Sequence, residues 1–302
     1  MEGNISFDRL CRLYGNAALE KLNSAHVLIC GLGGVGSWAA EAIARTAIGR
    51  ITLADFDIIG ETNINRQLPA LSDTIGIKKT EAMAARLRKI NPALAIKACD
   101  IRLKPENIPN FLYEKPDIVI DAIDNVTAKC FLIAHCRQNA IPIIVSCGSG
   151  GRTDPSKIKV CDLAETQNDA LARSVRYILR QKYGCPKTGP FGIQAVCSSE
   201  LPHKPFSGIK PDESKHVLPF DSLNFKSSSC SFELSSNFPA SGIESAVKSE
   251  NSSENKKNPE NSQIPASKAF INGTACFVTG SFGFFCASEA VKKIICGIDA
   301  GR

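Results

Sequence analysis

The expected fold follows from one stretch, AHVLICGLGGVGSW at residues 25–38. An apolar run leads into closely spaced glycines and then into residues that favour a helix, which gives the order strand, turn, helix. Gly31, Gly33 and Gly36 fit the pattern G-x-G-x-x-G: the first allows a tight turn, the second lets a pyrophosphate approach the backbone, and the third lets the helix pack on the strand. Amides at the helix start then face an anion. The stretch predicts a nucleotide site and leaves the nucleotide open.

Around this stretch, apolar strand patterns alternate with helical patterns. We expect strands at 50–55, 94–99, 117–124, 141–147 and 157–163, and helices at 37–46, 78–90 and 126–139. Strands with apolar interiors that alternate with helices predict an α/β fold. The expected architecture is a doubly wound, Rossmann-like, mostly parallel sheet with helices on both faces. A strand and a helix within 273–295 are expected to close the fold.

The chain divides into four segments by composition. Residues 1–24 predict a helical arm, amphipathic from residue 5 and broken at Gly15, that packs on the nucleotide domain or on a second subunit. Residues 25–200 form the nucleotide domain. Residues 201–268 are rich in Ser, Asn, Lys, Glu and Pro, so they are expected to be a disordered insertion that buries too little surface to order itself. Residues 269–302 complete the same domain.

Overall composition restricts the class of protein. The 302 residues carry a formal net charge of +6, which suits a polyanionic partner but does not by itself predict nucleic acid binding. The 13 cysteines include no C-x-x-C, which favours reduced thiols in the cytoplasm over a disulfide framework or a four-cysteine zinc site. The N-terminus lacks the features of a secretory signal. Residues 270–286 are apolar but short for a span of about 20 residues, so a buried or interfacial segment is expected there.

Charged residues after the second expected strand distinguish between nucleotides. Asp55 ends that strand, where an acidic residue binds ribose hydroxyls in this class of fold. Arg66 and Lys79 follow, and at the carboxyl edge of the sheet they would neutralise a triphosphate. Asp124, at the end of a later strand, would hold Mg²⁺. These cations favour ATP over a nicotinamide cofactor, and an NAD oxidoreductase stays as a weaker alternative. The sequence has no P-loop motif, so the expected ATP site is of another kind.

Five short motifs together resemble the ubiquitin-activating-like adenylating enzymes, the superfamily that also serves thiamin and molybdopterin synthesis. They are G-x-G-G-x-G at 31–36, D-F-D at 55–57, N-x-N-R-Q at 63–67, G-x-x-K at 76–79 and D-x-x-D-N at 121–125. The resemblance implies ATP and Mg²⁺ as cofactors, with Asp124 at the metal. It implies nucleotide contacts from Gly31, Gly33, Gly34, Gly36, Asp55, Asp57, Asn65, Gln67 and Asn125, and catalytic roles for Arg9, Asn63, Arg66, Lys79 and Asp124.

The same resemblance implies a homodimer, because in that superfamily an arginine matching Arg9 reaches the phosphates of the other subunit. Further motifs resemble one branch, the tRNA threonylcarbamoyladenosine dehydratases: R-L-Y-G at 12–15, GGVGSWAAE at 33–41, G-x-x-D-P at 151–155 and D-L-x-x-T at 162–166. This implies a ligase-like reaction on threonylcarbamoyladenosine at position 37 of tRNA. The threonyl carboxylate is adenylated at the expense of ATP, and the carbamoyl group then closes onto the activated carbon with a formal loss of water.

Two other functions stay open from the sequence. One is adenylation of the C-terminal glycine of a sulfur carrier, although activators of that kind usually carry paired C-x-x-C zinc sites. The other is a non-catalytic nucleotide-binding adaptor for a cysteine desulfurase or other sulfur-transfer proteins. Membrane association through 270–286 is the less favoured alternative to a cytoplasmic location.

A basic stripe and one cysteine complete the candidate residues. Arg173, Arg176 and Arg180 fall on one helix face, which predicts either an RNA contact or a solvated surface. Ala195 stands where a related sequence would carry a cysteine. Cys197 would either replace that cysteine or, as we favour, pack as a small apolar residue.

Overall fold

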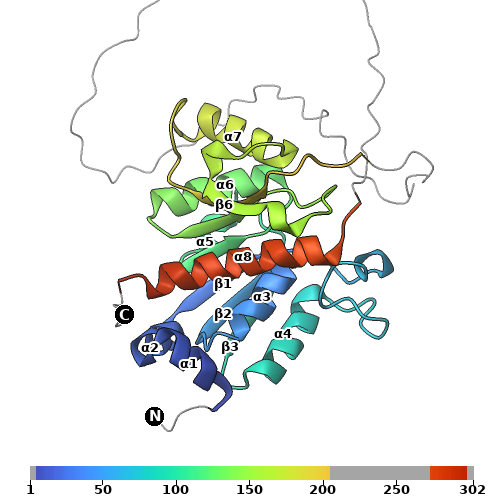
Figure 1. The fold of residues 1–302 in the computed structure, drawn as a ribbon, viewed down its shortest axis with the longest axis vertical. Coiled ribbons are helices and arrows are strands. Elements are labelled where there is room, and N and C mark those ends of the chain that lie inside the picture. The colour runs from blue at the N-terminus through green and yellow to red at the C-terminus, as the bar shows by residue number, and fades with distance from the viewer. Residues whose placement is uncertain (1–4, 205–272, 298–302) are drawn as a thin grey trace, which may run out of the picture. The chain divides into compact units, whose positions relative to one another are not determined.

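The computed structural model describes residues 5–204 and 273–297 (Figure 1). The insertion predicted at 201–268 therefore lies outside the described residues, except for 201–204. Both described segments belong to one unit of the chain.

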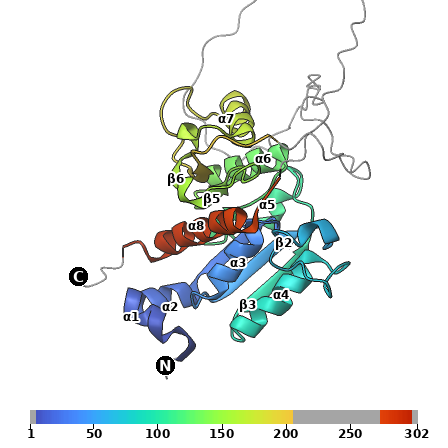
Figure 2. The same cartoon turned by 45° about the vertical axis from the view of Figure 1, so that its right-hand side comes forward.

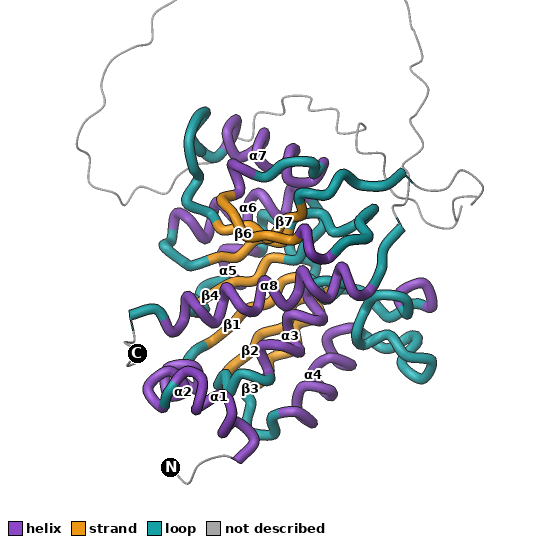
Figure 3. The backbone as a smooth tube through the Cα atoms, in the orientation of Figure 1, coloured by secondary structure: helices purple, strands orange, loops and turns teal. Residues whose placement is uncertain are grey.

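A seven-stranded sheet runs through this unit in the order β3-β2-β1-β4-β5-β7-β6. All neighbouring strands are parallel except β6, which runs antiparallel to β7. The strands are β1 (His26–Cys30), β2 (Arg50–Asp55), β3 (Ala95–Asp100), β4 (Ile118–Asp121), β5 (Ile143–Ser146), β6 (Ile158–Asp162) and β7 (Gln194–Ser198). The predicted doubly wound, mostly parallel sheet is confirmed, and Figure 3 shows its strands in orange.

Helices cover both faces of the sheet. They are α1 (Asp8–Tyr14), α2 (Asn16–Ser24), α3 (Gly36–Ala44), α4 (Lys79–Ile90), α5 (Ile108–Phe111), α6 (Val126–Gln138), α7 (Ala170–Lys182) and α8 (Cys276–Ile295), with short 3₁₀ turns at Ile5–Phe7, Glu61–Asn63, Pro155–Lys157 and Leu163–Glu165. One apolar cluster joins the sheet to α3, α4 and α8, and a second joins it to α5, α6 and α7. The helical arm breaks at Gly15, as predicted, where φ is +82°.

Alternate residues of a central strand enter opposite clusters. In β1, Val27 and Ile29 pack with α3 and α8, while Leu28 and Cys30 pack with α6. This period of two on a strand buried on both faces explains why the sequence shows continuous apolar runs rather than an apolar and polar alternation.

The end of the described chain is one helix, α8, which packs along α3 (Figures 1 and 2). The strand expected within 273–295 is absent from the described residues, because residues 273–275 pair with no strand and the helix begins at Cys276. Gly283 permits the close helix contact, because a Cβ there would lie 2.6 Å from the Val35 carbonyl oxygen. None of the described helices is both long and apolar enough to cross a membrane.

Candidate functional site

The glycine turn between β1 and α3 has the geometry that its sequence predicts. Gly31 has φ of +86°, and a Cβ there would lie 2.8 Å from the Ala122 carbonyl oxygen. A Cβ on Gly36 would lie 1.8 Å from the Gly31 carbonyl oxygen, so the turn can close only with glycine at both positions. At Gly33 a Cβ would meet no heavy atom within 4 Å. The backbone at Gly33 is therefore open to an approaching ligand, and Gly34 packs against Thr279 of α8 and the Arg66 side chain.

Asp55 is fixed at the carboxyl end of β2 beside this turn. Its Oδ2 accepts a hydrogen bond of 2.6 Å from the Leu32 amide, and its Oδ1 accepts one of 2.8 Å from the Asp57 amide. The side chain is buried. Each oxygen retains a lone pair after accepting one bond, so the carboxylate can also accept from ribose hydroxyls.

Lys79 begins α4 and forms an ion pair with Asp57. Lys79 Nζ lies 2.7 Å from Asp57 Oδ2, and the two side chains are 6% and 48% exposed. The lysine amide also donates to the Asp57 carbonyl oxygen at 3.1 Å. The predicted phosphate cation is therefore held at the site by an acidic residue that is itself half exposed.

The loop between β2 and α4 places the remaining predicted cation. The Arg66 guanidinium donates to the Thr62 carbonyl oxygen at 2.8 Å and to Asn65 Oδ1 at 2.9 Å. Desolvation by burial lowers the pKa of Arg66. The Trp38 indole donates to the Arg66 carbonyl oxygen at 3.1 Å, which ties the loop to α3. The Arg66 side chain thus lies over Gly34 of the glycine turn.

Three polar residues of the same loop have different surroundings. Buried Asn63 accepts a hydrogen bond of 3.1 Å from the Gly60 amide. Asn65 donates 3.0 Å to the carbonyl oxygen of Thr274, just before α8. Gln67 is buried, and its Oε1 has no hydrogen-bond partner among the described residues. The first two are therefore occupied in shaping the loop, whereas Gln67 retains an acceptor.

The acidic residues after β4 divide into a buried one and an exposed one. The strand ends at Asp121, so Asp124 lies three residues past it rather than at its end. Asp124 is exposed and has no hydrogen-bond or ion-pair partner in the described chain, whereas Asn125 accepts from the Ala128 amide at 2.9 Å and caps α6. An uncommitted carboxylate beside a glycine turn suits a cation that is shared with phosphates.

Lys129 is a buried residue that the sequence analysis missed. Its Nζ lies 2.9 Å from Asp121 Oδ2 and donates 2.9 Å to the Ile123 carbonyl oxygen, and both charged side chains are at most 2% exposed. Desolvation raises the pKa of Asp121, and the neighbouring lysine opposes that rise. The pair fixes the backbone that leads to Asp124. Its only sequence signal is a lysine within an apolar helix pattern.

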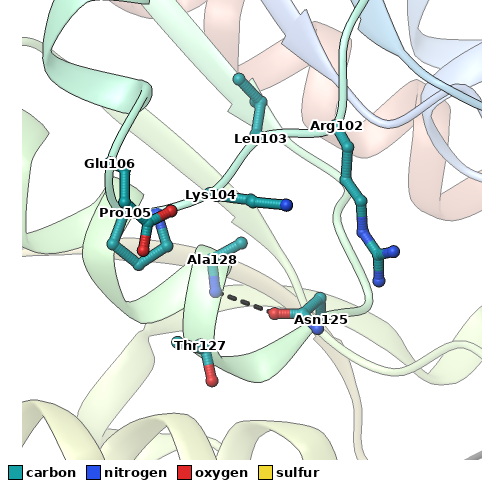
Figure 4. Close-up of a pocket in the computed structure, with 8 residues that line it drawn as sticks. All are labelled: Arg102, Leu103, Lys104, Pro105, Glu106, Asn125, Thr127 and Ala128. Atoms are coloured by element: carbon teal, nitrogen blue, oxygen red, sulfur yellow. Dashed lines mark hydrogen bonds between the residues drawn. The ribbon is translucent and has the colours of Figure 1, made fainter.

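A pocket opens next to Asn125 (Figure 4). It has a volume of about 210 Å³ and is lined by Arg102, Leu103, Lys104, Pro105, Glu106, Asn125, Thr127 and Ala128. The Arg102 guanidinium lies 4.9 Å from the ring centre of Phe56, which follows Asp55 directly. The pocket therefore lies between the loop after β3 and the start of α6, close to the end of β2.

Arg9 and the basic stripe are not brought to these residues. Arg9 is exposed on α1, which lies toward the amino edge of the sheet (Figure 1). Arg173, Arg176 and Arg180 all lie on α7, as predicted, but two have partners within the chain. Arg176 donates to the Thr166 hydroxyl, and the Arg180 guanidinium lies 5.0 Å from the ring centre of Phe191.

A second polar cluster, also missed from the sequence, surrounds the turn after β5. Buried Arg152 donates to the carbonyl oxygen of Gly148 at 3.0 Å and to that of Asn168 at 3.1 Å. Glu200 accepts from the Thr153 and Asp154 amides at 3.1 and 3.0 Å. Its partners lie far away in the sequence, so no local pattern indicates the cluster.

Cys197 lies inside β7 and is fully buried. Desolvation raises the pKa of its thiol to about 12, and the Cys161 thiol at 3.4 Å adds to the effect. A neutral, buried thiol fits the packing role that we favoured.

Comparisons with known proteins agree with this geometry. The chain matches the ThiF family over residues 7–300. It is 46% identical over 196 residues to the tRNA threonylcarbamoyladenosine dehydratase of Escherichia coli (strain K12), which covers 64% of this chain and 73% of that relative. Among solved structures, it resembles the E. coli tRNA N6-threonylcarbamoyladenosine dehydratase TcdA in complex with ATP, with a TM-score of 0.73 and 35% identity over 96% of this chain and 93% of the other. The AMP complex of the same enzyme matches with a TM-score of 0.72 and 36% identity, over 96% and 94% of the two chains.

Proposed function

The chain belongs to the ThiF family, and on that premise we propose that it is an ATP-dependent enzyme that cyclises threonylcarbamoyladenosine at position 37 of tRNA. The observation that carries the proposal is the likeness, over 96% of the chain, to a dehydratase that was solved with ATP. The predicted nucleotide residues of this chain also gather at one edge of its sheet. Fold and residues thus support the same reaction.

The arrangement of the strands suggests how ATP lies. The phosphates meet the open backbone at Gly33 and the start of α3, where amides face an anion. The ribose lies at Asp55, and the base enters the pocket between the loop after β3 and the start of α6. Arg66 and Lys79 flank the phosphates. Asp57, whose Oδ2 lies 2.7 Å from the Lys79 ammonium, would then share that lysine with a phosphate oxygen.

The donor set is compatible with Mg²⁺. The described residues contain no group of three or more His, Cys, Asp or Glu side chains that could hold a metal by themselves. Mg²⁺ usually binds through one or two carboxylates together with substrate phosphates, and Asp124 offers one uncommitted carboxylate. When bound, the ion supplies charge neutralisation at the phosphates. The chain's own part is to hold Asp124 in place through the backbone that Lys129 fixes.

The reaction needs two substitutions. A carboxylate oxygen of the threonyl group attacks the α-phosphorus of ATP, and pyrophosphate leaves. The carbamoyl group then attacks the activated carbonyl carbon, the bond from that carbon to the AMP oxygen breaks, and a proton passes from the carbamoyl group to solvent. Adenylation replaces a poor leaving group by AMP. The side chains of this site therefore act mainly by positioning the reactants and neutralising charge.

We infer that two copies of the chain form the active unit. Large apolar side chains are exposed on the loop between β2 and α4 and on α8: Ile58, Ile64, Leu71, Phe277 and Phe284. A soluble protein rarely leaves such a surface open. A second copy covering it would also provide the other subunit to which Arg9 is expected to reach. Light scattering should give twice the mass of one chain, and a monomer that retains full activity would exclude this arrangement.

Contact with tRNA is expected at α7. Arg173 is exposed and without a partner in the described chain, so its charge is available to a phosphate. Arg176 and Arg180 could contribute only by giving up or sharing their internal contacts. The overall charge of +6 favours approach of a polyanion.

The test is an assay with purified full-length protein, ATP, Mg²⁺ and tRNA that carries threonylcarbamoyladenosine. We expect AMP, pyrophosphate and a base lighter by one water, and none of these with tRNA that lacks the modification. Arg66→Ala should reduce the rate by about 10²–10³-fold, since it removes one charge-stabilising donor. Absence of AMP, or AMP formation stimulated by a carrier protein that ends in Gly-Gly and not by tRNA, would overturn the proposal.

A further inference from the structure

The turn Gly148–Arg152 lies next to the phosphate residues. It follows β5, which pairs in parallel with β4, so it leaves the sheet at the same carboxyl edge as Asp124. The Gly151 amide donates to the Gly273 carbonyl oxygen at 2.8 Å, and the adjacent Thr274 carbonyl oxygen accepts 3.0 Å from Asn65. Two consecutive residues thus connect this turn to the loop that carries Arg66.

The turn is held at its beginning by a buried ion pair. The Arg152 and Asp169 side chains are 2% and 1% exposed, and Arg152 Nη2 lies 3.3 Å from Asp169 Oδ2. The same carboxylate oxygen accepts a hydrogen bond of 2.7 Å from the Gly148 amide, and Arg152 donates back to the Gly148 carbonyl oxygen. Because the pair is shielded from water and both of its side chains also bond to the Gly148 backbone, the position of Gly148 is well defined.

The far side of the turn is held by hydrogen bonds to His203 and Glu200. The Gly151 carbonyl oxygen accepts a hydrogen bond of 2.6 Å from the His203 amide. The Glu200 carboxylate accepts from Thr153 and Asp154; desolvation raises its pKa, but these hydrogen bonds outweigh that effect and lower the pKa to about 2. Glu200 is therefore ionised at neutral pH and keeps its bonds.

Between these two anchors lie Ser149 and Gly150. Both are partly exposed, and within the described ranges neither their backbone amides nor the Ser149 hydroxyl has a hydrogen-bond partner. Two adjacent amide donors in a rigid turn beside a phosphate site have the properties of an oxyanion hole, which aims fixed donors at a charge that develops during reaction.

We propose that the amides of Ser149 and Gly150 bind the carbonyl oxygen of the activated threonyl group, and that Arg152 is the positioning residue that aligns them. The inference rests on the proposed function. Along the sheet edge, Asp55 ends β2, the glycine turn follows β1, Asp124 lies past β4 and Ser149 follows β5. Ribose, phosphates and acyl group then occupy successive positions, with the acyl group on the side away from the ribose.

The chemistry explains the need for such donors. When the carbamoyl group attacks the acyl-adenylate, the carbonyl oxygen takes up negative charge in the tetrahedral intermediate. That charge returns to the carbonyl as the bond to AMP breaks. Donors whose bonds to this oxygen strengthen as the charge develops accelerate cyclisation more than adenylation.

The decisive variant is Ser149→Pro, which removes one amide donor, with Ser149→Ala as its matched control because alanine keeps the amide and lacks the hydroxyl. We expect Ser149→Pro to slow cyclisation by about 10²–10³-fold, while pyrophosphate release in the first turnover persists. The tRNA should then carry bound AMP in rapid acid-quench samples with α-labelled ATP. Ser149→Ala should cyclise at the wild-type rate.

Arg152→Lys provides a second route if the proline variant fails to fold. Lysine keeps the charge opposite Asp169 but cannot span the same carbonyl oxygens, so it should also accumulate acyl-adenylate while the Kd for ATP stays unchanged. Normal cyclisation, or equal loss of adenylation and cyclisation, in the folded variants would overturn the inference alone. A wild-type protein that forms no AMP with modified tRNA would overturn the proposed function as well.

Discussion

The two halves of the sheet differ in what their polar side chains contact. Across residues 25–125 the site presents polar groups to a ligand: Asp124 has no partner in the described chain, and the backbone at Gly33 is open. Across residues 141–200 several polar side chains instead bond to groups inside the protein, although the Ser149 and Gly150 amides stay open in the part of the chain that the structure describes. Asp162 alone accepts hydrogen bonds from the amides of Ala164, Phe191, Gly192 and Ile193. The five superfamily motifs all belong to the first of these halves.

Lys129 gives the largest expected effect, because it lies on α6 just after the D-x-x-D-N motif and its charge is paired inside the protein. Lys129→Met leaves Asp121 buried without its cation, which should lower the free energy of unfolding by about 3–5 kcal/mol. Urea denaturation at pH 7 measures this. The double variant Asp121→Asn with Lys129→Met should recover part of the loss, and a single variant as stable as the wild type would show that the pair contributes nothing.

The adjacent residues Lys78 and Lys79 test which lysine contacts the phosphates. Lys79 is buried against Asp57, whereas Lys78 pairs on the surface with Asp100 at 2.7 Å. Lys79→Ala should reduce the rate of tRNA-dependent AMP formation by about 10²–10³-fold, because a cation at the phosphates is lost. Lys78→Ala should leave the rate unchanged. Equal effects of the two variants in the AMP assay would contradict the assignment of Lys79.

In the other half, Glu200→Gln should affect stability rather than nucleotide binding. The folded pKa of Glu200 is about 2, below the value of about 4.3 for a free glutamate, so its ionised form stabilises the protein above pH 4.3. We expect a loss of about 1–2 kcal/mol at pH 7 from the weakened charge-assisted bonds. Denaturation at several pH values should show the difference between wild type and variant shrinking as the pH falls from 4.3 toward 2. A difference that is constant across this range would be inconsistent with the shifted pKa.

The smallest effect is expected at the surface of α7. Arg173→Ala should weaken tRNA binding by a few-fold and reduce its salt dependence by about one counterion, as loss of one phosphate contact does. Filter binding at several salt concentrations measures both quantities. Arg88→Ala on α4, also exposed, is the matched control and should change neither. Identical salt slopes for the Arg173 variant and wild type would remove α7 from the RNA interface.

The sequence predicted six of the seven described strands and the glycine turn, because these depend on local properties, but it missed β7. A parallel strand buried on both faces must be apolar, and a turn that closes on its own backbone must carry glycine at 31 and 36. The prediction of a strand within 273–295 was wrong, because an apolar run that contains glycine suits a helix packed closely on another helix as well as it suits a strand. Lys129 and Arg152 were missed because the atoms that hold them come from distant residues.

Gly151 has a further consequence for the history of the chain. Its amide donates to Gly273 and its carbonyl accepts from His203, so one residue joins two segments that lie far apart in the sequence. Because the cost of closing a loop grows only slowly with its length, chains that differ widely in the number of residues between these points can share one catalytic domain. The chain between His203 and Gly273 is therefore a place where relatives can gain or lose residues and where a segment could be inserted by design.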